Sequence, residues 1–241
     1  MTTDAPRARA RGMTRARTTP VTIMMTSRAH DDDAKRRRPR DHAVGVMPRA
    51  PLRTSAREDL WVFAYGSLAY NAGFEHETRV KACARGFRRR FHQGSTDHRG
   101  TVDVPGRTAT LERSAGENAW GVAYKVNARD REDVLGMLEI REKQYDLRLE
   151  LDLYDTEDEG AEPIVRNAVT YVATASEDNL NWLGDAEDLA EQIARARGPS
   201  GENCEYLYKI AGAMRSIDVE DEYLYALEAR VRAIRGDVAE S

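Results

Sequence analysis

Runs and alternations of apolar residues predict six β-strands in the first two thirds of the chain. The most apolar run covers residues 61–68 (Trp-Val-Phe-Ala-Tyr-Gly-Ser-Leu), which is typical of a buried strand that ends at a glycine turn. Leucines at 147, 149, 151 and 153 alternate with polar residues, which predicts a half-buried strand. The remaining strands are expected over residues 80–91, 108–111, 120–126 and 168–173.

A helix is expected to start at Asp130, and apolar residues with helical spacing dominate the last third of the chain. Val134, Leu135 and Leu138 share one face of the first predicted helix. Three later helices are expected. The first begins at a cap at Asp185 and stops at Gly198-Pro199, the second covers residues 206–214, and the third runs from a cap at Asp218 to Ile234. Strands followed by helices predict an α+β domain with a mixed, largely antiparallel sheet or barrel and flanking and C-terminal helices.

The turn at the end of the first strand is the first place to expect ligand-binding groups. Gly66 allows the backbone to turn, and Ser67 adds a hydroxyl group. Loops at strand ends often gather the polar groups that contact a ligand. The alternative is a core strand with an ordinary turn, and the pattern alone leaves both open.

Glu142 is a carboxylate on an apolar helix row. It lies four residues after Leu138 and seven after Leu135, so a helix that runs so far would turn its carboxylate toward the interior. Burial would raise its pKa into the range of a general base. The alternative is a solvated helix end in which Glu139 and Lys143 form an i,i+4 ion pair, and spacing alone favours that interpretation.

Charge is divided between the beginning of the chain and the rest. Residues 1–57 carry 14 Lys and Arg but only 5 Asp, a net charge of +9, whereas the rest of the chain has a net charge of −13. The basic segment has no periodic apolar face, so we expect a disordered arm at 1–57 and a folded domain at 58–236. The alternatives for this arm are a transit peptide, a misassigned start, a dispensable tail, a nuclear signal and a nucleic-acid-binding arm.

Composition argues against several kinds of site. Cys83 and Cys204 have no CxxC spacing, which argues against a disulfide scaffold or a structural zinc site. The sequence contains no run of 18 apolar residues, so it predicts no membrane span. His92, Asp97 and His98 lie in a segment without the spacing of metal ligands, so we interpret residues 92–100 as a polar loop and expect no metal.

Three arginines, Arg88, Arg89 and Arg90, lie between Phe87 and Phe91. Aromatic residues interleaved with arginine are one pattern of single-stranded nucleic-acid binding. Because the domain is acidic, an edge strand with solvated alternate residues is the preferred interpretation, and we expect no nucleic-acid partner.

Many short motifs between about residues 60 and 235 resemble the ChaC-type, glutathione-specific γ-glutamylcyclotransferases. The segment Glu-Lys-Gln-Tyr-Asp at 142–146 is similar to the plant branch. The matching motifs are residues 62–68 (VFAYGSL), 89–95 (RRFHQGS), 97–100 (DHRG), 105–107 (PGR), 120–124 (WGVAY), 141–143 (REK), 145–146 (YD), 171–173 (YVA), 183–184 (LG), 190–200 (AEQIARARGPS) and 205–207 (EYL).

The resemblance implies a γ-glutamylcyclotransferase-like fold and an enzyme of glutathione degradation in the cytoplasm, with a plastid or mitochondrion as the alternative if the arm is a transit peptide. In that reaction the α-amine of the γ-glutamyl group attacks its own side-chain amide, which releases 5-oxoproline and cysteinylglycine without a cofactor. The resemblance places the general base and acid at Glu142, which reverses the preference from spacing alone.

The resemblance also implies a substrate site around the glycine turn. Backbone amides of the turn would hold the γ-glutamyl group and polarise the reacting carbonyl. The residues implied are Ala64, Tyr65, Gly66, Ser67, Leu68, Ala69 and Tyr145. Ala64 replaces a usual glycine and Ala69 a larger apolar residue, so other γ-glutamyl peptides or amines are alternative substrates. A γ-glutamyl-binding protein without turnover is the alternative outside enzymes.

Overall fold

The structure is a computed structural model that describes residues 49–237. The expectations of disorder or a targeting signal for residues 1–48 lie outside the described residues. Residues 49–57, assigned to the arm from sequence, contact the domain: Arg131 Nη2 donates to Thr54 Oγ1 at 2.7 Å, and the main-chain N–H of Arg53 donates to Glu150 at 2.9 Å. In residues 49–237, no helix has the length and apolar character needed to cross a membrane.

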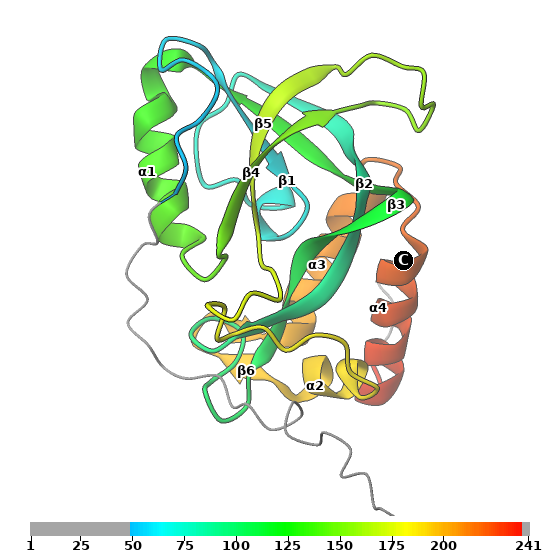
Figure 1. Ribbon diagram of the computed structural model, residues 1–241. Helices are drawn as coiled ribbons and strands as arrows, with labels where there is room; N and C mark the ends of the chain where they lie inside the picture. Colours follow the sequence, from blue (N-terminus) through cyan, green and yellow to red (C-terminus); the bar gives the residue numbers. More distant parts are fainter. Residues whose placement is uncertain (1–48, 238–241) are drawn as a thin grey trace, which may run out of the picture. The chain divides into compact units, whose positions relative to one another are not determined.

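Five strands form one mixed sheet (Figure 1). They are β1 (Leu60–Ala64), β2 (Thr78–Ser95), β3 (Gly106–Val126), β4 (Leu147–Leu153) and β5 (Val165–Val172). Their order is β2-β3-β1-β5-β4, in which β1 and β5 are parallel and the other neighbours antiparallel. The mixed, largely antiparallel sheet expected from sequence is confirmed.

The two outer strands of this sheet also meet. The N–H of Cys83 in β2 donates to the carbonyl of Tyr154 at 2.7 Å, and the N–H of Tyr154 donates back to the carbonyl of Cys83 at 3.0 Å. Tyr154 follows β4 directly, so these bonds close the sheet on itself. The parallel pairing of β1 with β5 brings residues about a hundred positions apart to the same end of the closed sheet.

Two of the predicted strands are parts of one longer strand. Residues 108–111 and 120–126 both belong to β3, which pairs with β2 on either side of a polar stretch around Gly116. The prediction of two strands was wrong because both segments pair with the same strand β2, although residues 114–117 between them have no partner in β2 and form an irregularity in the register. The predicted polar loop at 92–100 was also wrong in part, since β2 extends to Ser95 and buries His92 and Gln93.

Four α-helices complete the part of the chain that the structure describes: α1 (Arg131–Arg141), α2 (Leu189–Arg195), α3 (Asn203–Arg215) and α4 (Glu222–Arg235). Two short 3-10 turns, η2 (Ser67–Ala69) and η3 (Ala128–Asp130), follow β1 and precede α1. A small hairpin of β6 (Arg197–Gly198) and β7 (Gly201–Glu202), which the sequence did not predict, leads from α2 into α3.

The N-terminal caps of two helices differ from the predicted ones. Asp188, not Asp185, precedes α2. Asp221, not Asp218, caps α4, and its side chain accepts a hydrogen bond from the N–H of Leu224 at 2.9 Å. Asp221 lies within reach of the free N–H groups of the first turn, whereas the side chain of Asp188 makes no capping hydrogen bond to α2.

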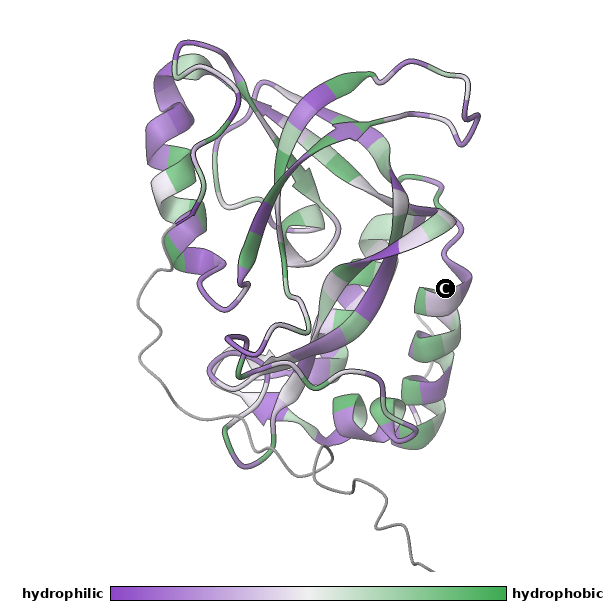
Figure 2. Ribbon diagram, in the orientation of Figure 1, coloured by the Kyte–Doolittle hydropathy of each residue, from purple (hydrophilic) through white to green (hydrophobic). Residues whose placement is uncertain are grey.

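The core lies between the sheet and the helices, with β1 at its centre. Val62, Phe63 and Ala64 are at most 1% exposed. Hydrophobic and hydrophilic residues alternate along the strands and around α1 and α4 in Figure 2, as expected for elements that each have one buried side. The turn η2 contacts α3, so the glycine turn after β1 lies between the sheet and this helix.

Candidate active site

A small pocket lies at the end of β1, where the strand gives way to the glycine turn. It brings together three parts of the chain: the strand and turn, the loop after α1, and the end of β5. The residues that line it are Phe63, Ala64, Tyr65, Gly66, Ser67, Leu68, Glu142, Tyr145, Thr170 and Tyr171. All the site residues expected from the sequence except Ala69 therefore line one pocket.

Glu142 is the acid of this pocket. It follows the last residue of α1, and its N–H still donates to the carbonyl of Leu138 at 2.8 Å, so its place on the apolar row is kept although the helix ends at Arg141. Only 9% of Glu142 is exposed. Burial raises the pKa of its carboxyl group to about 7, against the opposing effect of the Arg141 and Arg49 guanidinium groups.

The solvated helix end is therefore the wrong interpretation of this segment. Glu139 does not pair with Lys143 but contacts Arg148, at 2.6 Å from its Oε1 to Nη1. Lys143 instead lies 3.4 Å from Asp97. The chain bends after α1, so residues that would be neighbours on a longer helix contact different elements.

Arg141 connects the acid to the glycine turn. Its Nε lies 3.4 Å from Glu142 Oε1, and its Nη2 donates to Ser67 Oγ at 3.1 Å. The same guanidinium group donates to the main-chain carbonyls of Asn71 and Ala72, both at 3.0 Å. One side chain thus holds the turn and the following loop at a fixed distance from Glu142.

The glycine turn presents main-chain N–H groups to the pocket. The N–H groups of Gly66, Ser67 and Leu68 donate no hydrogen bond to any other residue that the structure describes. Arg89 fixes the preceding residue, since its Nε donates to the carbonyl of Tyr65 at 3.0 Å. An oxygen atom that gains negative charge during a reaction could accept from such free and fixed donors.

Three buried tyrosines surround the turn. Tyr65 donates to the carbonyl of Tyr171 at 2.5 Å, Tyr145 donates to the carbonyl of Ala109 at 2.8 Å, and Tyr206 accepts from the Ala109 N–H at 3.1 Å. Burial raises the pKa of all three hydroxyl groups well above the usual value, so they are neutral near pH 7. A Cβ at Gly66 would lie 3.3 Å from the Tyr206 hydroxyl, so a larger residue would crowd this shell.

A buried amide network holds the loop at residues 142–146. Gln93 Nε2 donates to the carbonyl of Gln144 at 2.8 Å, and Asn179 Nδ2 donates to Asp146 Oδ1 at 3.1 Å and to Gln93 Oε1 at 3.0 Å. Asp146 also accepts from the N–H of Thr174 at 2.8 Å. The loop that carries Glu142 and Tyr145 is therefore tied to β2 and to the segment after β5.

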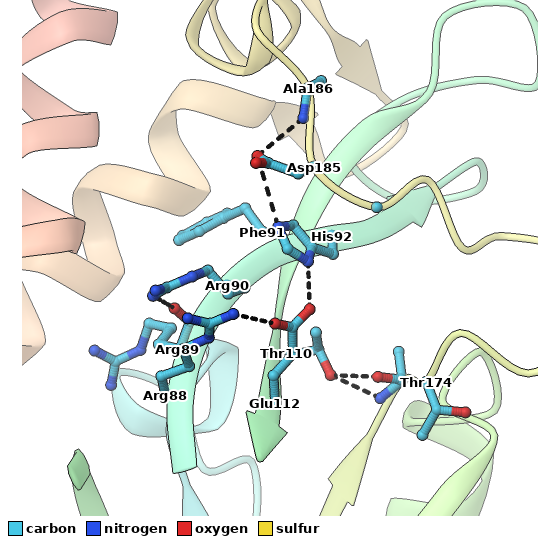
Figure 3. A network of polar contacts seen from close by, with 12 residues as sticks. Arg88, Arg89, Arg90, Phe91, His92, Thr110, Glu112, Thr174, Asp185 and Ala186 are labelled. Carbon is cyan, nitrogen blue, oxygen red and sulfur yellow. Dashed lines mark hydrogen bonds and ion pairs between the residues drawn. The ribbon is translucent and has the colours of Figure 1, made fainter. Parts of the chain in front are cut away.

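The arginine-rich part of β2 has a structural role that its pattern did not predict. Arg89 is 2% exposed and forms an ion pair with Asp221, whereas Arg88 and Arg90 are half-buried, so burial alternates along this edge strand with Arg89 on the side of Phe87 and Phe91. Its neighbour Arg88 contacts Glu112, which also contacts His92 (Figure 3). These contacts join β2, β3 and the start of α4.

His92 is a paired core residue in this network. It contacts Glu112 on one side and lies 3.8 Å from Asp185 on the other, as Figure 3 shows. His98 faces Asp97 and Ser200 instead, so the histidines of this segment do not converge. Within residues 49–237, no group of three or more His, Cys, Asp or Glu side chains is placed to hold a metal ion.

Ala69 lines a second, wider hollow on the other side of the turn. This hollow is open, and its polar side chains Glu75, His76 and Arg79 are exposed. Ala69 therefore lines this hollow and not the pocket with Glu142, and its part in substrate binding stays a prediction.

Several functional neighbours were not found from the sequence. Thr170 and Tyr171 fall in a predicted strand, but only the parallel pairing of β1 and β5 brings them to the pocket. Asn179 lies in a segment with no periodic pattern. Arg141 was part of a family motif, and no local signal indicated that it would reach Ser67.

The chain is similar to known proteins over the described domain. A model of the family described as ChaC-like protein matches residues 60–234. Gamma-glutamylcyclotransferase 2-3 of Arabidopsis thaliana is 44% identical over 185 residues, which cover 75% of this chain and 92% of that protein. Glutathione-specific gamma-glutamylcyclotransferase 1 of Homo sapiens is 38% identical over 175 residues, which cover 70% and 76%.

The same similarity holds for the fold. The crystal structure of a yeast gamma-glutamylcyclotransferase specific to glutathione is 29% identical in sequence and has a TM-score of 0.62. The match covers 74% of this chain and 100% of the yeast chain.

Proposed function

Since the chain belongs to the ChaC-like family, we propose that it is a glutathione-specific γ-glutamylcyclotransferase that converts glutathione to 5-oxoproline and cysteinylglycine. One observation supports this above the others: a buried carboxyl group with a pKa near 7 shares a pocket with the free N–H groups of a glycine turn. The reaction needs a base for the substrate amine and donors for the oxygen of the attacked amide.

The proposed reaction begins with ring closure and proton transfer to Glu142. The neutral α-amine of the γ-glutamyl group attacks the γ-carbonyl carbon to close a five-membered ring, and its nitrogen gives up one proton to the carboxylate as the bond forms. The carbonyl oxygen becomes an oxyanion, which the N–H groups of the turn at Gly66 and Ser67 stabilise; each such donor commonly contributes ~3–4 kcal/mol.

The ring then releases its leaving group. The oxyanion re-forms the carbonyl, the bond to the cysteine nitrogen breaks, and Glu142 returns its proton to that nitrogen. No water enters the reaction, and one carboxyl group serves first as base and then as acid. A pKa near 7 suits both roles, because the two protonation states are then equally accessible near neutral pH.

The tyrosines would shape the binding site without changing charge. Tyr145 and Tyr65 are neutral and fixed by hydrogen bonds, so they offer flat apolar surfaces beside the γ-glutamyl chain. Holding the amine and the carbonyl of one molecule together in the pocket supplies proximity and orientation.

The test is the rate of 5-oxoproline formation from glutathione by the purified full chain and by Glu142→Gln. The variant should lose ~10²–10⁴-fold in kcat, the usual contribution of a general base or acid, and near pH 7 it should unfold at a temperature no lower than that of the wild type. Glu132→Gln, on an exposed position of α1, is the matched control and should retain full activity. Wild-type turnover by the Glu142→Gln variant would remove the proposed mechanism.

A second candidate keeps the chemistry and changes the substrate. Ala64 lines the pocket and is 1% exposed, so its methyl group takes space that a glycine would leave free. Other γ-glutamyl peptides or amines would then be preferred over glutathione. Rates on glutathione, γ-glutamyl-alanine and γ-glutamyl-lysine distinguish the two, and tight binding of glutathione without 5-oxoproline would instead identify a binding protein.

A further inference from the structure

Arg49 reaches the active-site loop from a segment that precedes the family domain. Its side chain is 6% exposed, its Nη2 donates to the carbonyl of Tyr145 at 2.8 Å, and the same nitrogen lies 3.4 Å from the carbonyl of Glu142. The family match begins at residue 60, so these contacts come from outside the matched part of the chain.

The guanidinium group of Arg49 also connects the elements around the loop. Its Nε lies 2.5 Å from Glu139 Oε2 on α1, and its Cζ lies 4.8 Å from the centre of the Tyr171 ring on β5. The N–H of Tyr145 donates to the carbonyl of Glu142 at 3.0 Å, so Arg49 contacts both carbonyls of one tight turn. Carbonyl groups just after a helix lack helical partners, and a cation there satisfies them.

The rest of the segment is anchored to β4. The carbonyl of Ala50 accepts from Arg148 Nη2 at 2.5 Å, and Arg53 contacts Glu150 through its main chain and its side chain. Arg53 is more exposed than Arg49 and contacts no residue of the pocket. The segment is therefore held in place independently of the contact that Arg49 makes with the loop.

We propose that Arg49 is a positioning residue for the reaction, which fixes the loop of Glu142 and Tyr145 from outside the family domain. The inference rests on the proposed function, because the loop is the one that carries the proposed base. The start of the domain, taken as residue 58 from the sequence, is then not the start of the functional unit.

A change in charge at residue 49 should also change the pKa of Glu142. The charged groups that act on Glu142 are Arg141 on α1 and Arg49 itself, and Arg49 in turn pairs with Glu139 on α1. Five tyrosines surround Glu142, and burial keeps their hydroxyl groups neutral near pH 7. They are Tyr65 after β1, Tyr70 after η2, Tyr145 in the loop, Tyr171 on β5 and Tyr206 on α3. Loss of Arg49 leaves Arg141 as the only cation next to Glu142 among the residues described, and a carboxylate with fewer cations near it binds its proton more tightly.

The experiment compares Arg49→Met, Arg49→Lys and Arg53→Met in the full chain. Arg49→Met should lower kcat for glutathione by about tenfold, the effect of a small displacement of a reacting group, and move the acidic limb of the pH profile to higher pH. Arg49→Lys keeps the charge and should restore the position of the limb. Arg53→Met, the matched control from the same segment, should leave both kcat and the limb unchanged.

A titration without substrate separates this inference from the proposed function. The pKa of Glu142 can be followed by the side-chain carboxyl resonance of carbon-13 glutamate, assigned by its loss in Glu142→Gln. It should rise in Arg49→Met by up to about one unit and stay constant in Arg53→Met. An unchanged pKa and unchanged kcat in Arg49→Met would overturn the inference, as would equal effects of the two methionine variants. Failure of the wild-type chain to form 5-oxoproline would overturn the proposed function alone.

Discussion

Arg141 and Ser67, 74 residues apart in the sequence, are joined by a hydrogen bond of 3.1 Å between Nη2 and Oγ. The next residue after Arg141 is the proposed base, and the residue before Ser67 is the glycine of the turn. This contact sets the spacing between the group that would take a proton and the N–H groups that would stabilise an oxyanion. Both halves of the site therefore depend on one guanidinium group.

Replacement of Arg141 by Met should damage both halves. The turn loses its tether to α1, and the pKa of Glu142 rises because the nearest cation is gone. We expect kcat/KM for glutathione to fall by about tenfold to a hundredfold, with the acidic limb of the pH profile moved to higher pH. Arg129→Met is the control, since Arg129 is 81% exposed and its side chain contacts Asp130 alone among the described residues. Equal profiles of the two variants would contradict this role.

The activity of the wild-type chain should depend on pH through Glu142. The base must be ionised to take the proton, and burial raises its pKa from 4.5 to about 7. We therefore expect kcat/KM to rise with pH through a midpoint near 7, as measured by 5-oxoproline formation between pH 5 and 8. A rate that falls only below pH 5 would mean that the base has an ordinary pKa.

The stability of the domain should also depend on Glu142, but it should fall with rising pH where the activity rises. Between pH 4.5 and 7 the folded state holds a proton on Glu142 that the unfolded state has lost, so the free energy of unfolding falls as pH rises. The contribution is about 3 kcal/mol at full ionisation. Urea unfolding of wild type and Glu142→Gln measures it: the stability of the wild type relative to the variant should decrease from pH 4.5 to 8. A constant difference would contradict the burial of an ionisable acid.

Replacement of Asn179 by Ala should loosen the loop that carries Glu142. Its amide group donates to Gln93, Asp146 and the carbonyl of Thr174, all within 3.1 Å, and loss of it leaves Gln93 Oε1 and the Thr174 carbonyl without this donor, whereas Asp146 keeps its bonds from Thr174. We expect the free energy of unfolding to fall by about 1–3 kcal/mol and kcat to fall with it. Asp178→Ala, an exposed neighbour, is the control for both measurements. Full activity at reduced stability would show that the network supports the fold and not the loop.

Local patterns in the sequence were sufficient for most elements of the fold. The apolar run at 61–68, the alternating leucines of β4 and the helical spacing after Asp130 each reflect a side that must be buried, and burial leaves its period in the sequence. The place of Glu142 on the row of Leu135 and Leu138 came from the same argument. The choice between a buried acid and a solvated helix end, however, needed the family motifs.

Tertiary structure alone decided which distant residues meet. Strand β3 pairs with β2 on both sides of a polar stretch, Arg89 is buried in an ion pair with Asp221, and Arg49 contacts the loop although it precedes the domain. The period and composition of a segment indicate which side of that helix or strand is buried. Contacts between residues dozens of positions apart depend on how elements pack, and a hydrophobicity pattern has no record of which polar partners that packing brings together.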